Sequence, residues 1–240
     1  MKYFIANRTL VYSLLLWTVA LSRAADPRPP SAHSDSQIKA PNAVLHLDPY
    51  AGYARTKLFG LEAQGTKFVY VFDRSGSMGE IGGKPLRDAK SELLNSLNDL
   101  DRQQQFYIVF YNEKPRLFDA GNGRMVWATD DNKQLAAHFV DGITADGGTD
   151  HMGALTAALR MGPDVIFLLT DGEQQDDLSV DDLKRIDRLN SGHAQINVIQ
   201  FAPQPRPNSM LIDLAKQNHG QHIFVDIKNY LDSAAAAGGK

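Results

Sequence analysis

Side chains that end in oxygen gather at three places in the sequence. The apolar run 68–72 leads into a carboxylate and two hydroxyls spaced two residues apart, a glycine-rich loop supplies a third hydroxyl, and the run 165–169 is followed closely by a second carboxylate. Hydroxyl and carboxylate oxygens are hard ligands, which suit a hard divalent cation such as Mg²⁺. The candidate metal ligands are Asp73, Ser75, Ser77, Thr149 and Asp171.

The spacing of apolar residues predicts the elements that would position these ligands. Runs that are apolar on both faces are typical of buried parallel strands, and stripes at three- and four-residue steps are typical of helices. We therefore predict an α/β domain over about 62–235, with a doubly wound, mostly parallel central sheet flanked by helices. The strands are expected at 68–72, 106–111, 165–169, 196–201 and 223–227, and the helical stripes include Leu86 to Leu100, Leu155 to Leu159, Val180 to Leu189 and Met210 to Leu214.

Two further segments are expected to add strands at the margins. Residues 115–128 have the pattern of an antiparallel edge hairpin, with Gly121-Asn122-Gly123 as its turn. Leu58, Phe59 and Leu61 are apolar and could pack on the domain as a short lead-in strand. The expected sheet is therefore parallel with one antiparallel edge strand or hairpin.

All three oxygen-bearing segments are expected at the same edge of the sheet. In an open α/β sheet, ligands bind outside the carboxyl ends of the strands. Asp73 and Asp171 each follow a predicted strand, and Thr149 lies in a glycine-rich loop just before a predicted helix. Gly76 allows a tight turn between the two serines, so their hydroxyls can face one point. The sequence thus predicts one site built from segments that are remote in the chain.

Three short motifs mark the boundaries of these predicted elements. They are Asp-x-Ser-x-Ser at 73–77, Gly-Gly-Thr at 147–149 and Thr-Asp-Gly at 170–172. Together, and in this order, they resemble the von Willebrand factor type A domain and its metal-ion-dependent adhesion site. The first motif alone is weak evidence, whereas all three at the expected boundaries are specific. The resemblance covers about 62–235, and all five ligand positions of the family are occupied.

The resemblance implies a specific use of these side chains. The hydroxyls of Ser75, Ser77 and Thr149 would ligate Mg²⁺ directly, and one or both aspartates would act through water. Because neutral hydroxyls leave most of the charge on the cation, an open coordination position can accept an Asp or Glu carboxylate from a partner protein. Mn²⁺ and Ca²⁺ are the alternative cations. The loops expected to set specificity are 79–84, 142–150 and 172–179.

The main prediction is a non-enzymatic binding module, and three other interpretations stay open at this point. The first is a metal-dependent hydrolase with Asp73 as nucleophile or His151 as general base, although an aspartate-nucleophile phosphatase would want a second aspartate where Ser75 stands. The second is a structural domain with an unused site. The third treats the aspartate and serines as helix N-caps, which does not explain Thr149 and Asp171. His151 is otherwise expected as a surface or helix-start residue.

The N-terminal residues have the pattern of a secretory signal peptide. Lys2 and Arg8 precede an apolar stretch of 13 residues at 9–21, and Ser22 and Ala24 are small residues at the −3 and −1 positions of a cleavage site before Ala25. Because a membrane-spanning helix needs about 20 apolar residues, cleavage is favoured over an uncleaved anchor. The protein is therefore expected to be periplasmic or secreted, with membrane contact only if the segment is retained. The expected parts are a signal peptide at 1–24, a Pro-rich flexible linker and lead-in at 25–61, the domain at 62–235 and a tail at 236–240.

Charge and cysteine content exclude several classes of protein. The 240-residue chain has a formal net charge of −3, which becomes −6 once residues 1–24, with three basic side chains and no acid, are removed. Lys and Arg form no block longer than a pair, so the clustered positive footprint of a nucleic-acid-binding protein is absent from the sequence. The chain has no cysteine, which excludes thiol enzymes and cysteine-ligated zinc sites.

Overall fold

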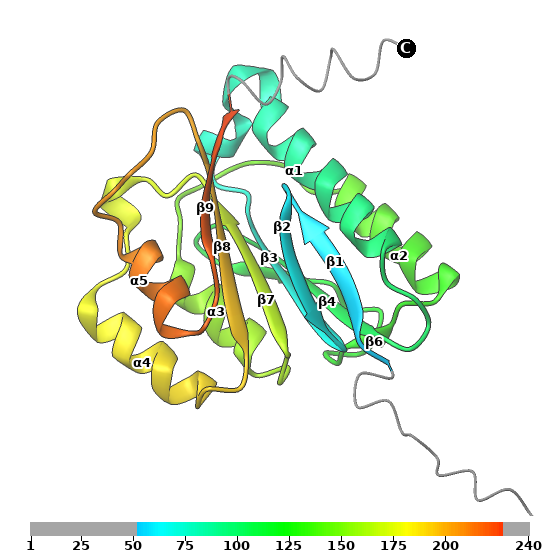
Figure 1. Cartoon of the computed structure of the whole chain (residues 1–240). Coiled ribbons are helices and arrows are strands. Elements are labelled where there is room, and N and C mark those ends of the chain that lie inside the picture. Colours follow the sequence, from blue (N-terminus) through cyan, green and yellow to red (C-terminus); the bar gives the residue numbers. More distant parts are fainter. Residues whose placement is uncertain (1–51, 228–240) are drawn as a thin grey trace, which may run out of the picture. The chain divides into compact units, whose positions relative to one another are not determined.

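The expected apolar runs form five parallel strands of one central sheet in the computed structural model, which describes residues 52–227 (Figure 1). These strands are β3 (Lys67–Asp73), β4 (Gln105–Tyr111), β7 (Val165–Thr170), β8 (Gln195–Ala202) and β9 (His222–Asp226). They are ordered β4-β3-β7-β8-β9, and each is parallel to its neighbour. The predicted fold class is confirmed, and the carboxyl ends of all five strands share one edge of the sheet.

Two short strands complete the sheet beside β4. β5 (Pro115–Leu117) and β6 (Val126–Trp127) both pair with β4 in antiparallel orientation, β5 near its carboxyl end and β6 near its amino end. The antiparallel edge is therefore confirmed, with β4 and β5 as its hairpin. The pairing expected within 115–128 is not the one observed, because β5 and β6 pair with β4 rather than with each other. The bend at Asn122 and Gly123, which both have positive φ, returns the chain to the start of β4.

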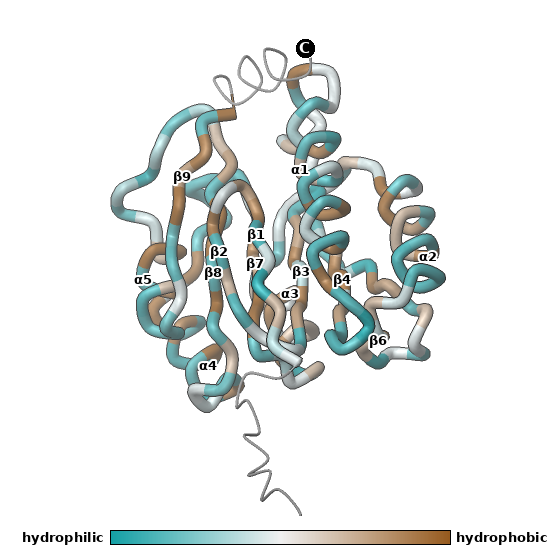
Figure 2. The backbone as a smooth tube through the Cα atoms, turned by 45° about the vertical axis from the view of Figure 1, so that its right-hand side comes forward, coloured by the Kyte–Doolittle hydropathy of each residue, from teal (hydrophilic) through white to brown (hydrophobic). Residues whose placement is uncertain are grey.

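Helices cover both faces of the sheet, and their outward sides are polar (Figure 2). Their buried residues pack into two clusters, one on each face. α1 (Glu80–Asn98) and α2 (Asp130–Asp141) lie on one face, and α3 (His151–Leu159), α4 (Val180–Asn190) and α5 (Met210–Gln217) lie on the other.

Helix α2 is not among the helices that the spacing of apolar residues predicts. Its apolar stripe is weak, since Leu135 is 51% exposed and the buried positions are Ala136 and Val140. A start signal was nevertheless present, because the side chain of Thr129 caps the helix by accepting a hydrogen bond from the backbone N–H of Asn132 at 3.3 Å. Capping residues were thus more informative here than periodicity.

A separate two-stranded hairpin packs on the same face as α1. β1 (Ala54–Leu58) and β2 (Leu61–Gly65) are antiparallel and turn through Phe59 and Gly60, at φ 50° and 81°. Leu58 and Leu61 are buried, and the ring of Phe59 lies 4.9 Å from that of Phe201 on β8. The expected lead-in strand is therefore half of a hairpin that contributes to the core.

The described residues do not reach the predicted signal peptide at 1–24, most of the linker and lead-in at 25–61, or the tail at 236–240. The hairpin spans the predicted boundary at residue 62. Within residues 52–227, no helix combines the length and hydropathy needed to cross a bilayer.

Candidate functional site

Asp73 ends strand β3 and is completely buried. Its two carboxylate oxygens accept hydrogen bonds, one from the backbone N–H of Ser75 at 2.8 Å and one from the hydroxyl of Thr170 at 2.7 Å. Burial, followed by the negative charge of Asp171, raises the pKa of Asp73 from 3.8 to about 7. A positive charge placed beside Asp73 would therefore stabilise its ionised form.

The turn after β3 brings the two predicted serine ligands together. A short 3-10 turn, η1 (Gly76–Gly79), follows Ser75, and the side-chain oxygens of Ser75 and Ser77 lie 3.1 Å apart. Between them, the backbone N–H of Gly76 donates to the carbonyl of Gly147 at 2.9 Å. A Cβ atom at residue 76 would lie 3.4 Å from that carbonyl oxygen, an ordinary contact distance, so this hydrogen bond does not itself require glycine.

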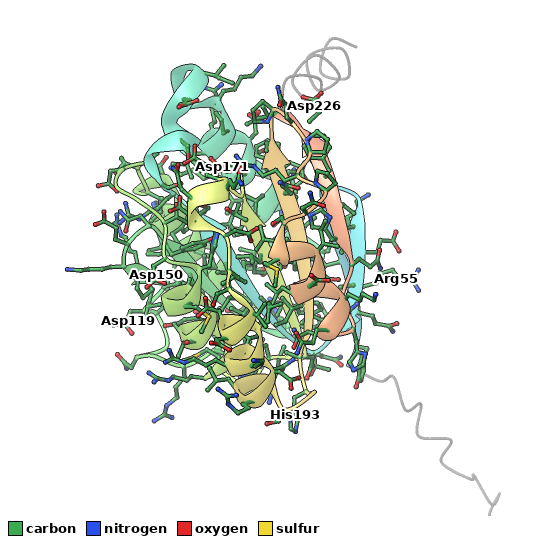
Figure 3. The ribbon with its side chains drawn as sticks, turned by 90° about the vertical axis from the view of Figure 1, so that its left-hand side faces the viewer. Arg55, Asp119, Asp150, Asp171, His193 and Asp226 are labelled. Atoms are coloured by element: carbon green, nitrogen blue, oxygen red, sulfur yellow. The ribbon has the colours of Figure 1, made fainter. Side chains whose placement is uncertain are left out.

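Asp171 follows β7 and reaches the serine turn from the neighbouring strand. Burial raises the pKa of Asp171, and a hydrogen bond with the side chain of Ser77 offsets part of this shift. The next residue, Gly172, has a φ of 63°, and a Cβ atom there would lie 3.2 Å from Leu211. Asp171 lies at the end of the domain where α1 begins (Figure 3).

Thr149 comes from the loop between α2 and α3, and it is half-buried. Two residues before it, Gly147 accepts the hydrogen bond from Gly76. One residue after it, the backbone N–H of Asp150 donates to the carbonyl of Asn112 at 2.8 Å, and the Asp150 carboxylate caps α3. The loop that carries Thr149 is therefore tied both to the serine turn and to the end of β4.

The structure thus gathers the candidate ligands at the carboxyl edge of the sheet. A chain of hydrogen bonds joins Asp73, Ser75, Ser77 and Asp171, and Thr149 joins them through its backbone neighbours. Coordination of a metal by these residues stays a prediction.

His151 begins α3, as expected of a helix-start residue, but it is buried rather than exposed. Its Nδ1 atom lies 2.8 Å from the hydroxyl oxygen of Tyr111, and the two rings meet edge-on with centroids 5.7 Å apart. Burial lowers the pKa of His151 from 6.5 to about 4, so the imidazole is neutral at pH 7. These contacts are those of a core histidine.

A cavity of about 360 Å³ opens beside the candidate ligands and is lined by Ser77 and Asp171. It is also lined by residues of the loop after β8, which the sequence analysis did not include among the specificity loops. This loop could have been identified from Pro203 and Pro205, which mark the end of the apolar run at 196–201. Loops that follow the carboxyl ends of parallel strands lie on the ligand-binding edge of the sheet. Other lining residues include Glu80, Ile81, Glu173 and Arg206.

Comparison with known proteins assigns the family. Residues 68–231 match the model of the von Willebrand factor type A domain. The chain belongs to this family. The resemblance inferred from the three motifs is therefore confirmed at the level of the von Willebrand factor type A domain.

Two curated relatives of this von Willebrand factor type A domain protein are heavy chains of inter-alpha-trypsin inhibitor. The mouse (Mus musculus) protein described as inter alpha-trypsin inhibitor, heavy chain 4, is 28% identical over 118 residues, which are 44% of this chain and 12% of the relative. The corresponding human protein is 28% identical over 127 residues, which are 48% of this chain and 13% of the relative. The matches therefore span a small part of each relative.

Solved structures with the same fold include bacterial and animal proteins. A von Willebrand factor type A protein from Catenulispora acidiphila has a TM-score of 0.61 at 20% identity, covering 73% of this chain and 43% of that chain. Proximal thread matrix protein 1 from the mussel byssus, solved with a zinc-occupied metal-ion-dependent adhesion site motif, has a TM-score of 0.51 at 17% identity, covering 68% and 42%. At these identities, the similarity establishes the fold.

The donor set of this von Willebrand factor type A domain fits a hard divalent cation. It offers three hydroxyls and two carboxylates, all of them oxygen donors. Both oxygens of Asp73 already accept hydrogen bonds from protein groups, which suits a contact with a cation through water. Residues 52–227 contain no cluster of three or more His, Cys, Asp or Glu side chains suited to a metal, so the fit rests on the hydroxyls.

Proposed function

We propose that this protein is an exported, non-enzymatic binding module that uses a divalent cation to bind an Asp or Glu side chain of a protein partner. Domains of this family often mediate protein–protein contacts. The observation that carries the proposal is the pair of serine hydroxyls 3.1 Å apart, flanked by two carboxylates whose pKa values are raised. The proposed ligands are Asp73, Ser75, Ser77, Thr149 and Asp171.

Each proposed ligand has a role that follows from its surroundings. The hydroxyls of Ser75, Ser77 and Thr149 would contact the cation directly, while Asp73 would supply negative charge through water. A bound cation would supply positive charge and an open coordination position for the carboxylate of the partner. Mg²⁺ is the proposed cation, with Mn²⁺ and Ca²⁺ as alternatives, and the zinc-bound mussel protein supports a divalent ion at the equivalent motif.

Export rests on the N-terminal pattern at 1–24, whose cleavage before Ala25 would release the protein to the periplasm or the medium. If this segment is retained, it would anchor the protein to the membrane. The proposed partner is a protein rather than a nucleic acid, because the chain is acidic overall and lacks a basic cluster.

A pull-down from the native envelope fraction tests the proposed function. We expect the wild-type protein to retain a partner in Mg²⁺ and to lose it in EDTA, and Asp73→Ala to lose it in both conditions, because the variant lacks one of the two carboxylates. The matched control is Asp119→Ala, which removes one carboxylate at an exposed loop position. Equal capture by wild type in Mg²⁺, wild type in EDTA and Asp73→Ala would contradict the metal-bridged mode of binding.

A further inference from the structure

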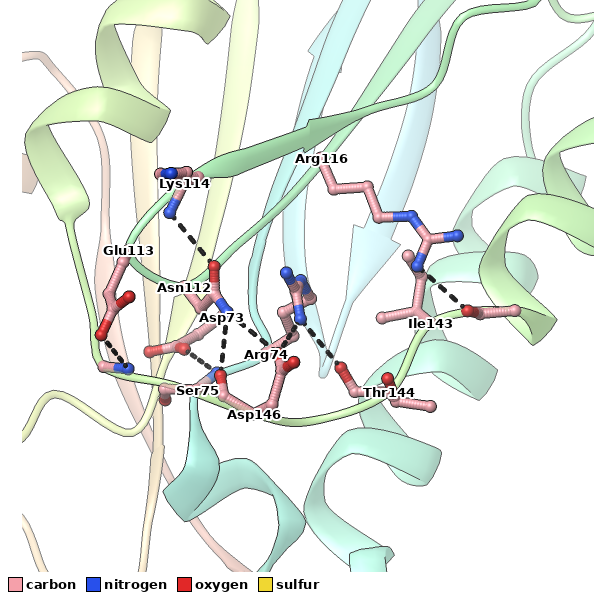
Figure 4. A network of polar contacts seen from close by, with 12 residues as sticks. Asp73, Arg74, Ser75, Asn112, Glu113, Lys114, Arg116, Ile143, Thr144 and Asp146 are labelled. Atoms are coloured by element: carbon pink, nitrogen blue, oxygen red, sulfur yellow. Dashed lines mark hydrogen bonds and ion pairs between the residues drawn. The ribbon is translucent and has the colours of Figure 1, made fainter.

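We propose that Arg74, Asn112 and Asp146 form a positioning network that holds the loop carrying Thr149 in the geometry required for metal binding. We call these three residues the loop clamp (Figure 4). The inference rests on the proposed metal site, and it assigns a role to residues that are not themselves ligands.

Two backbone hydrogen bonds bring the serine turn and the Thr149 loop into contact. The N–H of Gly76 donates to the carbonyl of Gly147, and the N–H of Asp146 donates to the carbonyl of Arg74, both at 2.9 Å. The donors and acceptors alternate between the two segments, so the segments are aligned residue by residue. A shift of either segment would separate Thr149 from the serines.

Side chains of the loop clamp reinforce this alignment around Asp146. The Arg74 guanidinium donates to the carbonyl of Thr144 at 3.2 Å and to the carboxylate of Asp146. From the other side, the side-chain amide of Asn112 donates to the carbonyl oxygen of Asp146 at 3.0 Å and to its carboxylate at 2.9 Å. Asp146 is therefore held from the end of β3 by Arg74 and from the end of β4 by Asn112.

The loop clamp also restricts the residue that follows Asp146. Gly147 has a φ of 71°, and a Cβ atom there would lie only 2.9 Å from Nδ2 of Asn112. The amide of Asn112 thus packs directly on the backbone of Gly147, two residues before Thr149. Groups that hydrogen-bond directly to metal ligands typically change metal affinity about 10–100-fold when they are removed, and the loop clamp acts on Thr149 through the backbone of the same loop.

The exposed fractions of the Arg74 and Asp146 side chains bear on whether the loop clamp positions the loop or mainly stabilises the fold. The side chain of Asp146 is 65% exposed, whereas that of Arg74 is 13% exposed. Because the carboxylate of Asp146 stays in contact with water, the ion pair stabilises the fold less than a fully buried pair would, and the effect on loop geometry is measured separately through metal affinity. If Arg74 acted only through its charge, Arg74→Gln would bind a nearby cation more tightly, because the variant removes a positive charge. A positioning role predicts weaker binding instead.

The test measures Mg²⁺ affinity of the purified protein by isothermal titration, together with the midpoint of thermal unfolding in EDTA. We expect Arg74→Gln to weaken Mg²⁺ binding by about tenfold or more. The matched control is Arg116→Gln, which removes the same charge from a residue that donates to the carbonyl of Gly142 at 3.2 Å, at the start of the same loop. This control should leave the affinity unchanged.

A double variant and a conservative variant sharpen the test. Because Arg74 and Asp146 act as one unit, Arg74→Gln combined with Asp146→Ala should bind Mg²⁺ no more weakly than the weaker single variant. Arg74→Lys keeps the positive charge but loses the planar fork of donors, so it should also weaken Mg²⁺ binding. If Arg74→Gln does not fold, Arg74→Lys alone tests the positioning role.

Two outcomes separate failure of the loop clamp from failure of the metal site. Wild-type or tighter Mg²⁺ binding by Arg74→Gln and Arg74→Lys, with binding lost in Asp171→Asn, would overturn the positioning role and leave the proposed function intact. Wild-type protein that does not bind Mg²⁺, Mn²⁺ or Ca²⁺ would overturn both.

Discussion

Asp73 and His151 are both buried, and burial moves their pKa values in opposite directions because it disfavours the charged form of each. The pKa of Asp73 is raised to about 7, where a neighbouring cation would favour its ionised form. The pKa of His151 is lowered to about 4, which keeps the imidazole neutral against Tyr111. Acid therefore acts on the two residues with opposite effects on folding.

Replacement of His151 should make the protein more tolerant of acid. Its folded pKa of about 4 lies below its ordinary value of 6.5, so the unfolded chain binds the proton first, and stability falls as pH decreases through this window. At pH 5, protonation of the unfolded chain costs the wild type about 2 kcal/mol that His151→Asn avoids. Urea unfolding in EDTA at pH 7 and pH 5 measures the difference.

The control for this prediction is His138→Asn, at an exposed position of α2. If wild type and His151→Asn lose the same stability between pH 7 and pH 5, protonation of His151 does not limit acid stability.

At the scale of elements, burial decided which parts were predictable. Strands β3, β4, β7 and β8 are buried on both faces, so their apolar runs are continuous and were found from sequence. Helix α2 was not predicted, because its buried stripe consists of Ala136 and Val140 only and Leu135 is exposed. Of the β1–β2 hairpin, only one lead-in strand was expected, because both strands are short and have one exposed face. The candidate ligands could be found from sequence because Asp73 and Asp171 follow the ends of predicted strands. The loop clamp and the role of the loop at 203–206 were not predicted. Both depend on contacts between segments that are remote in sequence, and the spacing of apolar residues carries no information on such contacts.

The β1–β2 hairpin should contribute strongly to folding even though part of it lies before residue 62. Leu58 is fully buried in the core cluster with α1, so Leu58→Ala should lower the free energy of unfolding by about 2–5 kcal/mol. Arg55→Ala is the control, because its ion pair with Glu62 at 3.6 Å joins two exposed side chains and should be worth less than about 1 kcal/mol. Urea unfolding distinguishes the two, and similar losses would show that the hairpin does not depend on its core contact.

At the scale of the whole molecule, the candidate ligands come from three segments that meet only in the folded chain. A cation that binds them favours the folded state over the unfolded state, and the gain grows with the logarithm of its concentration. Binding of a cation at the proposed site would therefore be linked to global stability.

Mg²⁺ at about 100 times its dissociation constant should raise the free energy of unfolding by about 2.7 kcal/mol relative to EDTA. Asp171→Asn should lose most of this gain, because it removes one of the two candidate carboxylates. Urea unfolding in Mg²⁺, and in KCl of equal ionic strength as the control, measures the effect. An equal Mg²⁺-dependent gain in the wild type and Asp171→Asn would place the bound cation elsewhere.

The two ends of the described chain leave from opposite edges of the sheet. The carbonyl of Gly52 accepts a hydrogen bond at 2.7 Å from the side chain of Gln104, which directly precedes the amino end of β4. Ile227 instead follows the carboxyl end of β9 and lines the cavity beside Ser77 and Asp171. A sensor chip attached through residues ahead of Gly52 would thus hold the edge that carries the candidate ligands toward the solution.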